Sequence, residues 1–273
     1  MRRLSLLSTA APLALATFAG IASAAEESAL ETVVVTTATR VPTPEAEVAS
    51  SITVITADDI AAKQNQTLPD VLQDVPGLNI VQAGGPGAQA SIFMRGTNSN
   101  HTKVLVDGID VSDPSNPSDT FDFGQFPAQD IERVEVLRGP QSGLYGSDAI
   151  GGVINIITKS GSGPAQWNAS AQGGSFDTFN QTAGVSGSTS QFHYTASLQH
   201  LRSGETPVTP SDLLPPGMSR IDDYYDNVTG STKLGFDVTD HLDLGLVARY
   251  TDTHLRTTGN DPNEFPSPPE GEQ

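Results

Sequence analysis

The part of the chain after Gly163-Pro164 consists of segments in which apolar residues alternate with small or polar ones. A period of two places alternate side chains on opposite faces of a β-strand, as for Leu242, Leu244 and Leu246 on one face of the last segment. The segments are ~9–13 residues long, near the length of a tilted membrane-spanning strand. Soluble β-sandwiches have strands of the same appearance, so the pattern leaves both architectures open. We expect about five strands, in QWNASAQGG, TFNQTAGVSGS, QFHYTASLQHL, NVTGSTKLGFDV and HLDLGLVARYTDTHL.

The start of the chain has the features of a secretion signal. Arg2-Arg3 forms a positive start, Leu4–Ile21 forms a mostly apolar run, and Ala22–Ala24 has the small-x-small cleavage pattern. A membrane anchor is the alternative, but Pro12 interrupts the apolar run. We therefore expect residues 1–24 to be a cleavable signal peptide.

Composition narrows the function further. The net charge is −18, and removal of the signal takes away two arginines and no acids, which gives −20. A chain this acidic is not expected to bind nucleic acid, because phosphate recognition needs a basic surface. There is no cysteine and hence no disulfide. No second apolar run approaches the roughly 20 residues of a membrane helix, so contact with a membrane would require β-structure.

The middle of the chain predicts a mixed α/β domain over residues 51–160. Ser51–Thr56 alternates like a half-buried strand, and the spacing from Thr56 to Asp59 fits a capping box that starts a short helix. A second helix should follow Thr67 and end at Pro76-Gly77. Its apolar face would contain Leu68, Val71, Leu72 and Val75. Further strands are expected in residues 78–82, 91–96, 102–108, 132–139 and 151–159, with long irregular loops at 83–90 and 111–127.

Three motifs follow one another between residues 31 and 159: ETVVVTT, the pair FMRG and VLVDG, and ERVEVLRGPQSGLYGSDAIGGVINIITK. Over residues 31–160 the chain closely resembles the plug domain of TonB-dependent outer-membrane receptors, and most of all the cobalamin transporters. The resemblance implies a mixed α/β plug domain followed by antiparallel strands of a transmembrane β-barrel in the outer membrane. It also implies active uptake of a scarce ligand with TonB as partner. Cobalamin is the first expectation and a ferric siderophore the alternative; a soluble periplasmic TonB-binding module is the rival from another class.

The resemblance also gives a role to the segment that follows the signal. It identifies residues 31–37 as a TonB box, which TonB captures by strand addition. The residues concerned are Glu31, Thr32, Val33, Val34, Val35, Thr36 and Thr37. Pro42 and Pro44 argue against a hairpin, so residues 25–50 are expected to form an extended arm free of the plug. The alternative is that the box forms the first edge strand of the plug.

The resemblance further implies sites in the plug and in the strands. Ligand contacts are expected at Gln82, Gly84, Gly85, Gly87, Gln89, Asn98, Ser112, Asp113, Asn116 and Ser118. Arg95 and Arg138 are expected to meet barrel glutamates, or else to pair locally with Glu132 or Glu135. Asp222, Asp223 and Asp226 carry the oxygen ligands that Ca²⁺ prefers, although a solvated acidic loop is the commoner explanation. The scattered histidines, the absence of thiols and the lack of HExxH or GxSxG motifs argue against an enzyme.

The length of the tail does not match a complete receptor. The resemblance implies a barrel of about 22 strands, which needs about 220 residues at roughly 10 residues per strand. Only 113 residues follow residue 160, since 273 − 160 = 113. We therefore expect residues 161–273 to be a partial, truncated barrel.

Overall fold

The computed structural model describes residues 34–116, 118–208, 210–214, 220–239 and 242–257. Residues 1–24, for which a signal peptide is expected, and Glu31–Val33 of the expected TonB box lie outside these ranges. The described residues all belong to one compact unit. No helix among the described residues is long and apolar enough to cross a membrane.

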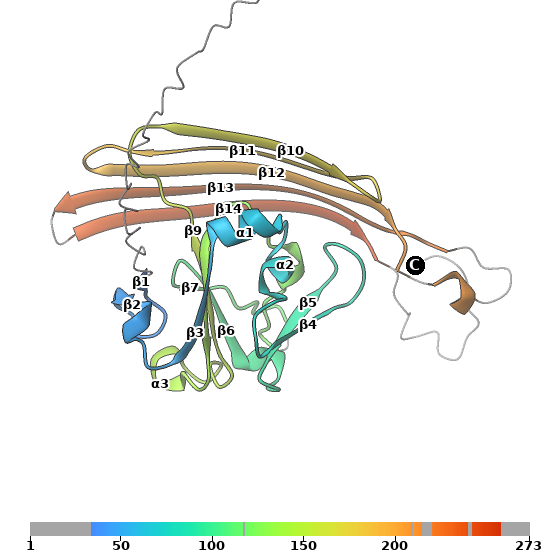
Figure 1. Cartoon of the computed structure of the whole chain (residues 1–273), viewed down its shortest axis with the longest axis horizontal. Coiled ribbons are helices and arrows are strands. Elements are labelled where there is room, and N and C mark those ends of the chain that lie inside the picture. The colour runs from blue at the N-terminus through green and yellow to red at the C-terminus, as the bar shows by residue number, and fades with distance from the viewer. Residues whose placement is uncertain (1–33, 117, 209, 215–219, 240–241, 258–273) are drawn as a thin grey trace, which may run out of the picture. The chain divides into compact units, whose positions relative to one another are not determined.

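The mixed domain is built on a five-stranded sheet of order β3-β8-β9-β6-β7 (Figure 1). Its strands are β3 (Ser51–Thr56), β6 (Thr102–Val106), β7 (Ile109–Asp110), β8 (Ile131–Arg138) and β9 (Gly152–Thr158). β6 and β9 pair in parallel, and the other neighbours pair antiparallel. A separate hairpin joins β4 (Leu78–Gln82) to β5 (Ala90–Met94).

The helices of this domain begin where the sequence predicts. Thr56 and Asp59 form a complete capping box before α1 (Ala57–Lys63), and Thr67 with Asp70 does the same before α2 (Leu68–Leu72). The side chains predicted for the apolar face of this helix are buried in one core cluster, Leu68, Val71, Leu72 and Val75. The helix itself ends at Leu72, before the predicted end at Pro76-Gly77. A short helix α3 (Ser142–Tyr145) and the 3-10 turns η1 (Glu45–Glu47), η2 (Ser99–His101), η3 (Phe123–Gln125) and η4 (Ser211–Leu213) complete the helical elements described.

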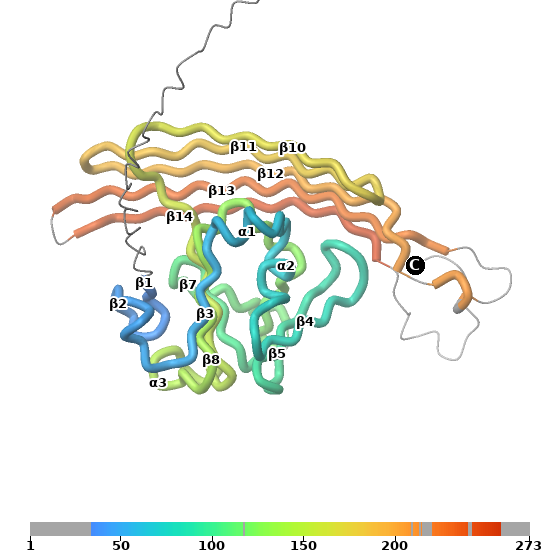
Figure 2. Tube along the Cα trace, in the orientation of Figure 1, coloured from blue at the N-terminus to red at the C-terminus, as the bar shows by residue number. Residues whose placement is uncertain are grey.

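The predicted tail strands form one antiparallel sheet, in which each strand pairs with the next along the chain (Figure 2). They are β10 (Gln166–Gly174), β11 (Thr178–Ser188), β12 (Phe192–Thr206), β13 (Asp223–Thr239) and β14 (Leu242–Arg256). The described part of the tail has five strands, as predicted, and the predicted order of a mixed α/β domain followed by antiparallel strands is confirmed.

The two faces of this sheet differ as the alternation predicts. Leu242, Leu244 and Leu246 are 51%, 58% and 57% exposed on one face of β14. The opposite face carries side chains that contact the mixed domain, including Lys233 of β13 and Arg249 of β14. The face of β14 with these leucines is therefore apolar and open, while the opposite face is more polar and is covered by the mixed domain only in part, since Asp243 and Thr251 on it are exposed.

The arm differs from the extended segment expected. β1 (Val34–Val35) pairs antiparallel with β2 (Thr43–Pro44), so the chain does fold back despite its prolines. Proline lacks only the N–H donor, and at the edge of a two-stranded ribbon this donor is not needed. The expectation that no hairpin forms here was wrong.

Candidate functional site

The docked arm is the first part of the candidate site. Val35 and Thr37 are fully buried, although they come from a segment expected to be free. The backbone N–H groups of Thr36 and Thr37 donate to Glu135 Oε2 at 3.0 and 2.9 Å, and the Thr37 hydroxyl donates to the same oxygen at 2.5 Å. Consecutive backbone N–H groups that point the same way bind a single carboxylate oxygen well. The arm is therefore bound to the domain, contrary to expectation, although its strand β1 pairs with β2 and not with the five-stranded sheet.

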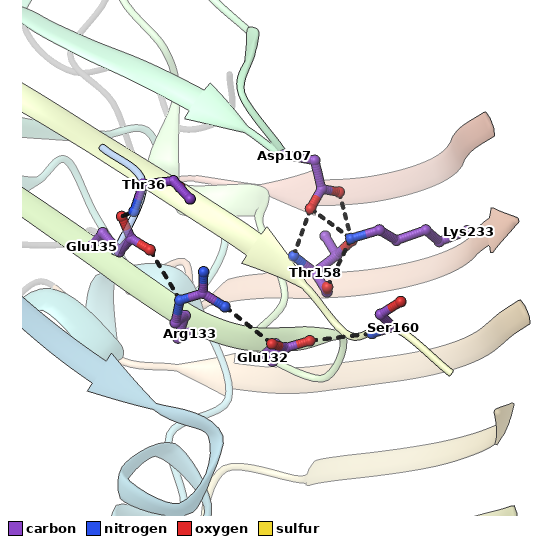
Figure 3. Close-up of polar contacts among 8 residues, drawn as sticks. All are labelled: Thr36, Asp107, Glu132, Arg133, Glu135, Thr158, Ser160 and Lys233. Carbon is purple, nitrogen blue, oxygen red and sulfur yellow. Dashed lines mark hydrogen bonds and ion pairs between the residues drawn. The ribbon is translucent and has the colours of Figure 1, made fainter. Parts of the chain in front are cut away.

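Further contacts hold the same segment. The Tyr145 hydroxyl donates to the Thr37 carbonyl at 2.8 Å, and the Arg40 guanidinium lies 4.7 Å from the Tyr145 ring centroid. Burial raises the pKa of Tyr145 above its ordinary value, which keeps the phenol protonated and able to donate. Glu135 is itself fully buried and receives Arg133 Nε at 2.9 Å on its other oxygen (Figure 3). The carboxylate is thus paired and satisfied on both oxygens.

The glycine loop, residues 83–89 between β4 and β5, is the second part of the candidate site. Gln82 donates to the Gly85 carbonyl at 2.7 Å, and Ala83 N–H donates to the Gln89 carbonyl at 2.9 Å. Gly85 N–H donates to Asp223 Oδ2 at 2.9 Å. A Cβ placed on Gly87 would lie 2.0 Å from the Tyr225 ring, so only glycine allows the two to pack. The loop is therefore tied to β13 rather than free.

The second predicted loop meets the first at one point. Asp122 Oδ1 accepts from Ala90 N–H at 3.0 Å and from Gly124 N–H at 2.9 Å. A Cβ on Gly124 would come within 2.1 Å of the Ala88 carbonyl oxygen. These contacts bring the end of the second loop against the glycine loop.

The predicted ligand residues are not all in one place. Gln82, Gly84, Gly85 and Gly87 line a cavity of about 330 Å³ beside the glycine loop, together with Leu201 and Ser203 of β12. Ser112, Asp113 and Asn116 lie on the second loop, where their side chains make local turn contacts, and Ser118 on the same loop donates its backbone N–H to Asn116 Oδ1. Asn98 follows β5 and precedes η2, at the opposite end of the β4–β5 hairpin from the glycine loop. The structure therefore groups the first set and separates Asn98 from it.

Two ion pairs join the mixed domain to the strands. Lys233 Nζ contacts Asp107 Oδ1 at 2.8 Å, and Arg249 pairs with the buried Asp130. The Arg249 guanidinium also lies 4.1 Å from the centroid of the Phe126 ring. In these pairs the domain supplies the acids and the strands supply the bases. Their sequence separations of 126 and 119 residues left no local signal from which to find them.

Comparison with known protein families finds a similarity in the mixed domain. Residues 44–153 match the family model described as "TonB-dependent Receptor Plug Domain". Over these 110 of its 273 residues the chain is therefore similar to the plug domains of TonB-dependent receptors. The match covers β3, the helices and most of the plug sheet, but not the arm strand or the tail strands.

Solved structures resemble the plug and the strands together. The ferripyoverdine receptor of Pseudomonas aeruginosa bound to ferripyoverdine is 22% identical, with a TM-score of 0.66 over 84% of this chain and 28% of that one. The ferric yersiniabactin uptake receptor of Yersinia pestis is 24% identical, with a TM-score of 0.57 over 75% of this chain and 32% of that one. The siderophore receptor PirA of Acinetobacter baumannii is 26% identical, with a TM-score of 0.59 over 75% and 32%. The chain thus spans about a third or less of these proteins.

Arg138, one of the two arginines expected to meet barrel glutamates, makes local contacts among the described residues. Arg138 donates to the Pro76 carbonyl at 2.6 Å and to Thr53 Oγ1 at 2.8 Å. Burial, and then the nearby Arg95, lower the pKa of Arg138. The local partners weighed from the sequence, Glu132 and Glu135, are instead paired with Arg133. A role for Arg95 and Arg138 at a barrel wall stays a prediction.

The three aspartates considered for calcium have separate partners. Asp222 pairs with Arg220, and Asp223 accepts from the glycine loop of the plug. Asp226 contacts His200 Nε2 at 3.1 Å and the Tyr224 hydroxyl at 2.9 Å. Within the described ranges, no three acidic, histidine or cysteine side chains are grouped as a metal site would require. The structure does not bring these carboxylates together.

Proposed function

We propose that the plug and strands act in TonB-dependent uptake of a ferric siderophore across an outer membrane. The observation that carries the proposal is the plug domain, preceded by a short β-strand and followed by an antiparallel sheet with one open apolar face. The similar solved structures are described as siderophore receptors, one of them bound to its ferric ligand. They favour the siderophore alternative over cobalamin, which stays a prediction without support from them.

In this proposal the arm is the partner-binding element. Residues 31–37 would add as a strand to TonB, with main-chain hydrogen bonds as the source of affinity. In the docked state the N–H groups of Thr36 and Thr37 donate to Glu135, so these hydrogen bonds must break before TonB can bind the segment. The glycine loop and its cavity are the proposed ligand side, because they combine a lined cavity with backbone and amide groups.

Binding to TonB tests the partner. The purified full chain is titrated with the periplasmic domain of TonB, and Val34→Pro is compared with Val41→Pro as the matched exposed-valine control. We expect Val34→Pro to weaken binding at least tenfold, because strand addition needs the N–H that proline lacks. Val41→Pro lies outside the box and should bind within about twofold of the original chain. Equal loss in both variants, or no binding by the original chain, would refute the role of the box.

Equilibrium dialysis against ferric siderophores tests the ligand. A ferric catecholate, a ferric hydroxamate and cyanocobalamin are compared on the same detergent-solubilised chain. We expect retention of at least one ferric complex and none of cyanocobalamin. Retention of cyanocobalamin alone would reverse the choice of ligand.

A further inference from the structure

The Thr37 hydroxyl lies between two buried polar side chains of neighbouring plug strands. It donates to Glu135 Oε2 of β8 at 2.5 Å and accepts from Asn155 Nδ2 of β9 at 3.2 Å. Glu135 and Asn155 are directly opposite each other in the β8–β9 pairing. Thr37 and Glu135 are fully buried and Asn155 is 5% exposed, so none of these groups has bulk water as a ready substitute partner.

The other end of the Asn155 amide reaches the turn between β6 and β7. Its oxygen accepts from Gly108 N–H at 3.3 Å. Asp107, the residue before Gly108, has a positive φ of 51° that fixes the turn. The Asp107 carboxylate accepts from Thr158 N–H at 3.0 Å and from Lys233 Nζ of β13 at 2.8 Å (Figure 3). One asparagine side chain therefore bridges the docked arm and the turn that holds the strand sheet.

Hydrogen-bond energetics predict that the docked arm and the β6–β7 turn stabilise each other. A single neutral hydrogen bond contributes only about 0.5–1.5 kcal/mol, but a buried group left without its partner costs about 1–3 kcal/mol. When the arm leaves, Asn155 Nδ2 loses the Thr37 oxygen and Glu135 loses three donors on one oxygen. If the Asn155 amide turns toward a new partner, its oxygen no longer accepts from Gly108 N–H.

We propose that Asn155 couples docking of residues 36–37 to the Asp107–Lys233 ion pair, so that withdrawal of the arm weakens the hold of the plug on β13. The inference rests on the proposed function for its purpose, which would be to make capture of the arm loosen the plug. The contacts that carry it lie within the chain and do not depend on the identity of the partner.

A second chain of contacts leaves the arm but ends at the surface. Glu135 pairs with Arg133, Arg133 with Glu132 at 3.0 Å, and Glu132 with the backbone N–H of Ser160 at 3.3 Å (Figure 3). The Glu132 side chain is 42% exposed, and an ion pair at such a site contributes about 0–1 kcal/mol. The geometry therefore assigns the coupling to the buried route through Asn155.

Amide hydrogen exchange at Thr158 tests the coupling without TonB. This N–H donates to the Asp107 side chain and so reports directly on the turn. Thr37→Val keeps the shape of the side chain and removes its hydroxyl. In the full chain we expect it to speed exchange at Thr158 about five- to tenfold. Asn155→Leu should speed exchange at Thr158 by a similar factor. When Asn155 is already leucine, Thr37→Val should speed this exchange less than twofold further, because both changes break the same route.

The reverse direction gives an independent test if Asn155→Leu does not fold. Coupling is reciprocal, so Lys233→Met should speed exchange at the Thr37 amide, which donates to Glu135. The double change Asp130→Asn with Arg249→Met removes the other ion pair between plug and strands without leaving a buried charge unpaired, and it should leave Thr37 exchange within twofold. An unchanged Thr158 rate in Thr37→Val would overturn the proposal. So would independent effects of Thr37→Val and Asn155→Leu on that rate, or equal changes of Thr37 exchange in Lys233→Met and in the double variant. Because TonB is absent, such a failure is distinct from failure of the TonB titration.

Discussion

Gly87 sits against the Tyr225 ring in a backbone conformation that favours glycine, with φ +76°. An added Cβ would lie 2.0 Å from Tyr225 Cδ2. We expect Gly87→Ala to lower the free energy of unfolding by about 2–5 kcal/mol, from about 1–2 kcal/mol for the left-handed backbone and about 1–3 kcal/mol for overpacking. Urea unfolding of the purified chain measures this loss.

Gly96 provides the matched control, because it has nearly the same φ, +78°, with no described atom within 4 Å of an added Cβ. Gly96→Ala should lower the free energy of unfolding only by the cost of a left-handed backbone at alanine, about 1–2 kcal/mol. Equal losses in the two variants would mean that the Tyr225 ring moves aside and does not position the loop.

The Tyr145 hydroxyl holds the arm through a single bond to the Thr37 carbonyl, at 2.8 Å. Removal of this donor in Tyr145→Phe should weaken docking by about 0.5–1.5 kcal/mol. If docking competes with TonB, affinity for the periplasmic domain of TonB should rise about two- to tenfold, measured by the same titration. Tyr250→Phe, 70% exposed on β14, is the control and should not change affinity. Weaker TonB binding in Tyr145→Phe would contradict competition between the two states.

At the scale of elements, the cap of α1 makes stability depend on pH. Hydrogen bonds from the Thr56 side chain and then its backbone hold the pKa of Asp59 below its ordinary value of 3.8. A carboxyl whose pKa is lower in the folded state than in the unfolded state stabilises the fold. The contribution is complete when the pH is above the unfolded-state pKa, and it is lost as the pH falls through the folded-state pKa. Asp59→Asn should therefore destabilise the chain at pH 7 by about 0.5–1 kcal/mol and by less below pH ~3.

Asp58 is the control for this cap, since it lies in the same first turn of α1 outside the capping box. Urea unfolding of Asp58→Asn at pH 7 and at low pH should show a smaller difference between the two conditions. A pH dependence of equal size in both variants would assign the effect to the helix dipole and not to the cap.

The elements that could be predicted from the sequence are those with a local cause. β10 and β11 were predicted to the residue, because strict alternation and a short turn define both ends. The cap spacing of Thr56 and Asp59 likewise identified the start of α1. The β1–β2 hairpin was missed, because what holds its end is Glu135, 98 residues from Thr37. The glycine loop was found as a candidate, but its partner Tyr225 was not.

For the molecule as a whole, the apolar face of the strand sheet is proposed to meet lipid. Leu246 is 57% exposed on that face of β14. Leu246→Arg should destabilise the sheet in lipid vesicles by about 2–4 kcal/mol, the range for arginine at the bilayer midplane. Thr251→Arg places the same charge on the opposite face and should cost no more than about 0.5 kcal/mol. Urea unfolding in vesicles compares the two, and equal costs would contradict a lipid-facing surface.

The contact between plug and strands depends on a buried charge that the sequence did not reveal. Asp130 is 4% exposed and is paired with Arg249, which also packs on Phe126. Arg249→Met leaves this carboxylate buried without its partner, which costs about 3–5 kcal/mol. The double change Asp130→Asn with Arg249→Met removes both charges and should recover most of that loss, because a buried pair contributes little net stability over neutral groups.

Urea unfolding measures the stability of these variants. Limited proteolysis reports whether the plug detaches, because a detached plug exposes the linker at residues 159–165. Single Asp130→Asn is the informative third variant. It leaves Arg249 without its acid, but at 21% exposure the guanidinium keeps access to water and the Phe126 ring, so its loss should be smaller than that of Arg249→Met. If the double variant were as unstable as Arg249→Met, the packing of the arginine on Phe126, and not the buried charge, would be what joins plug to strand.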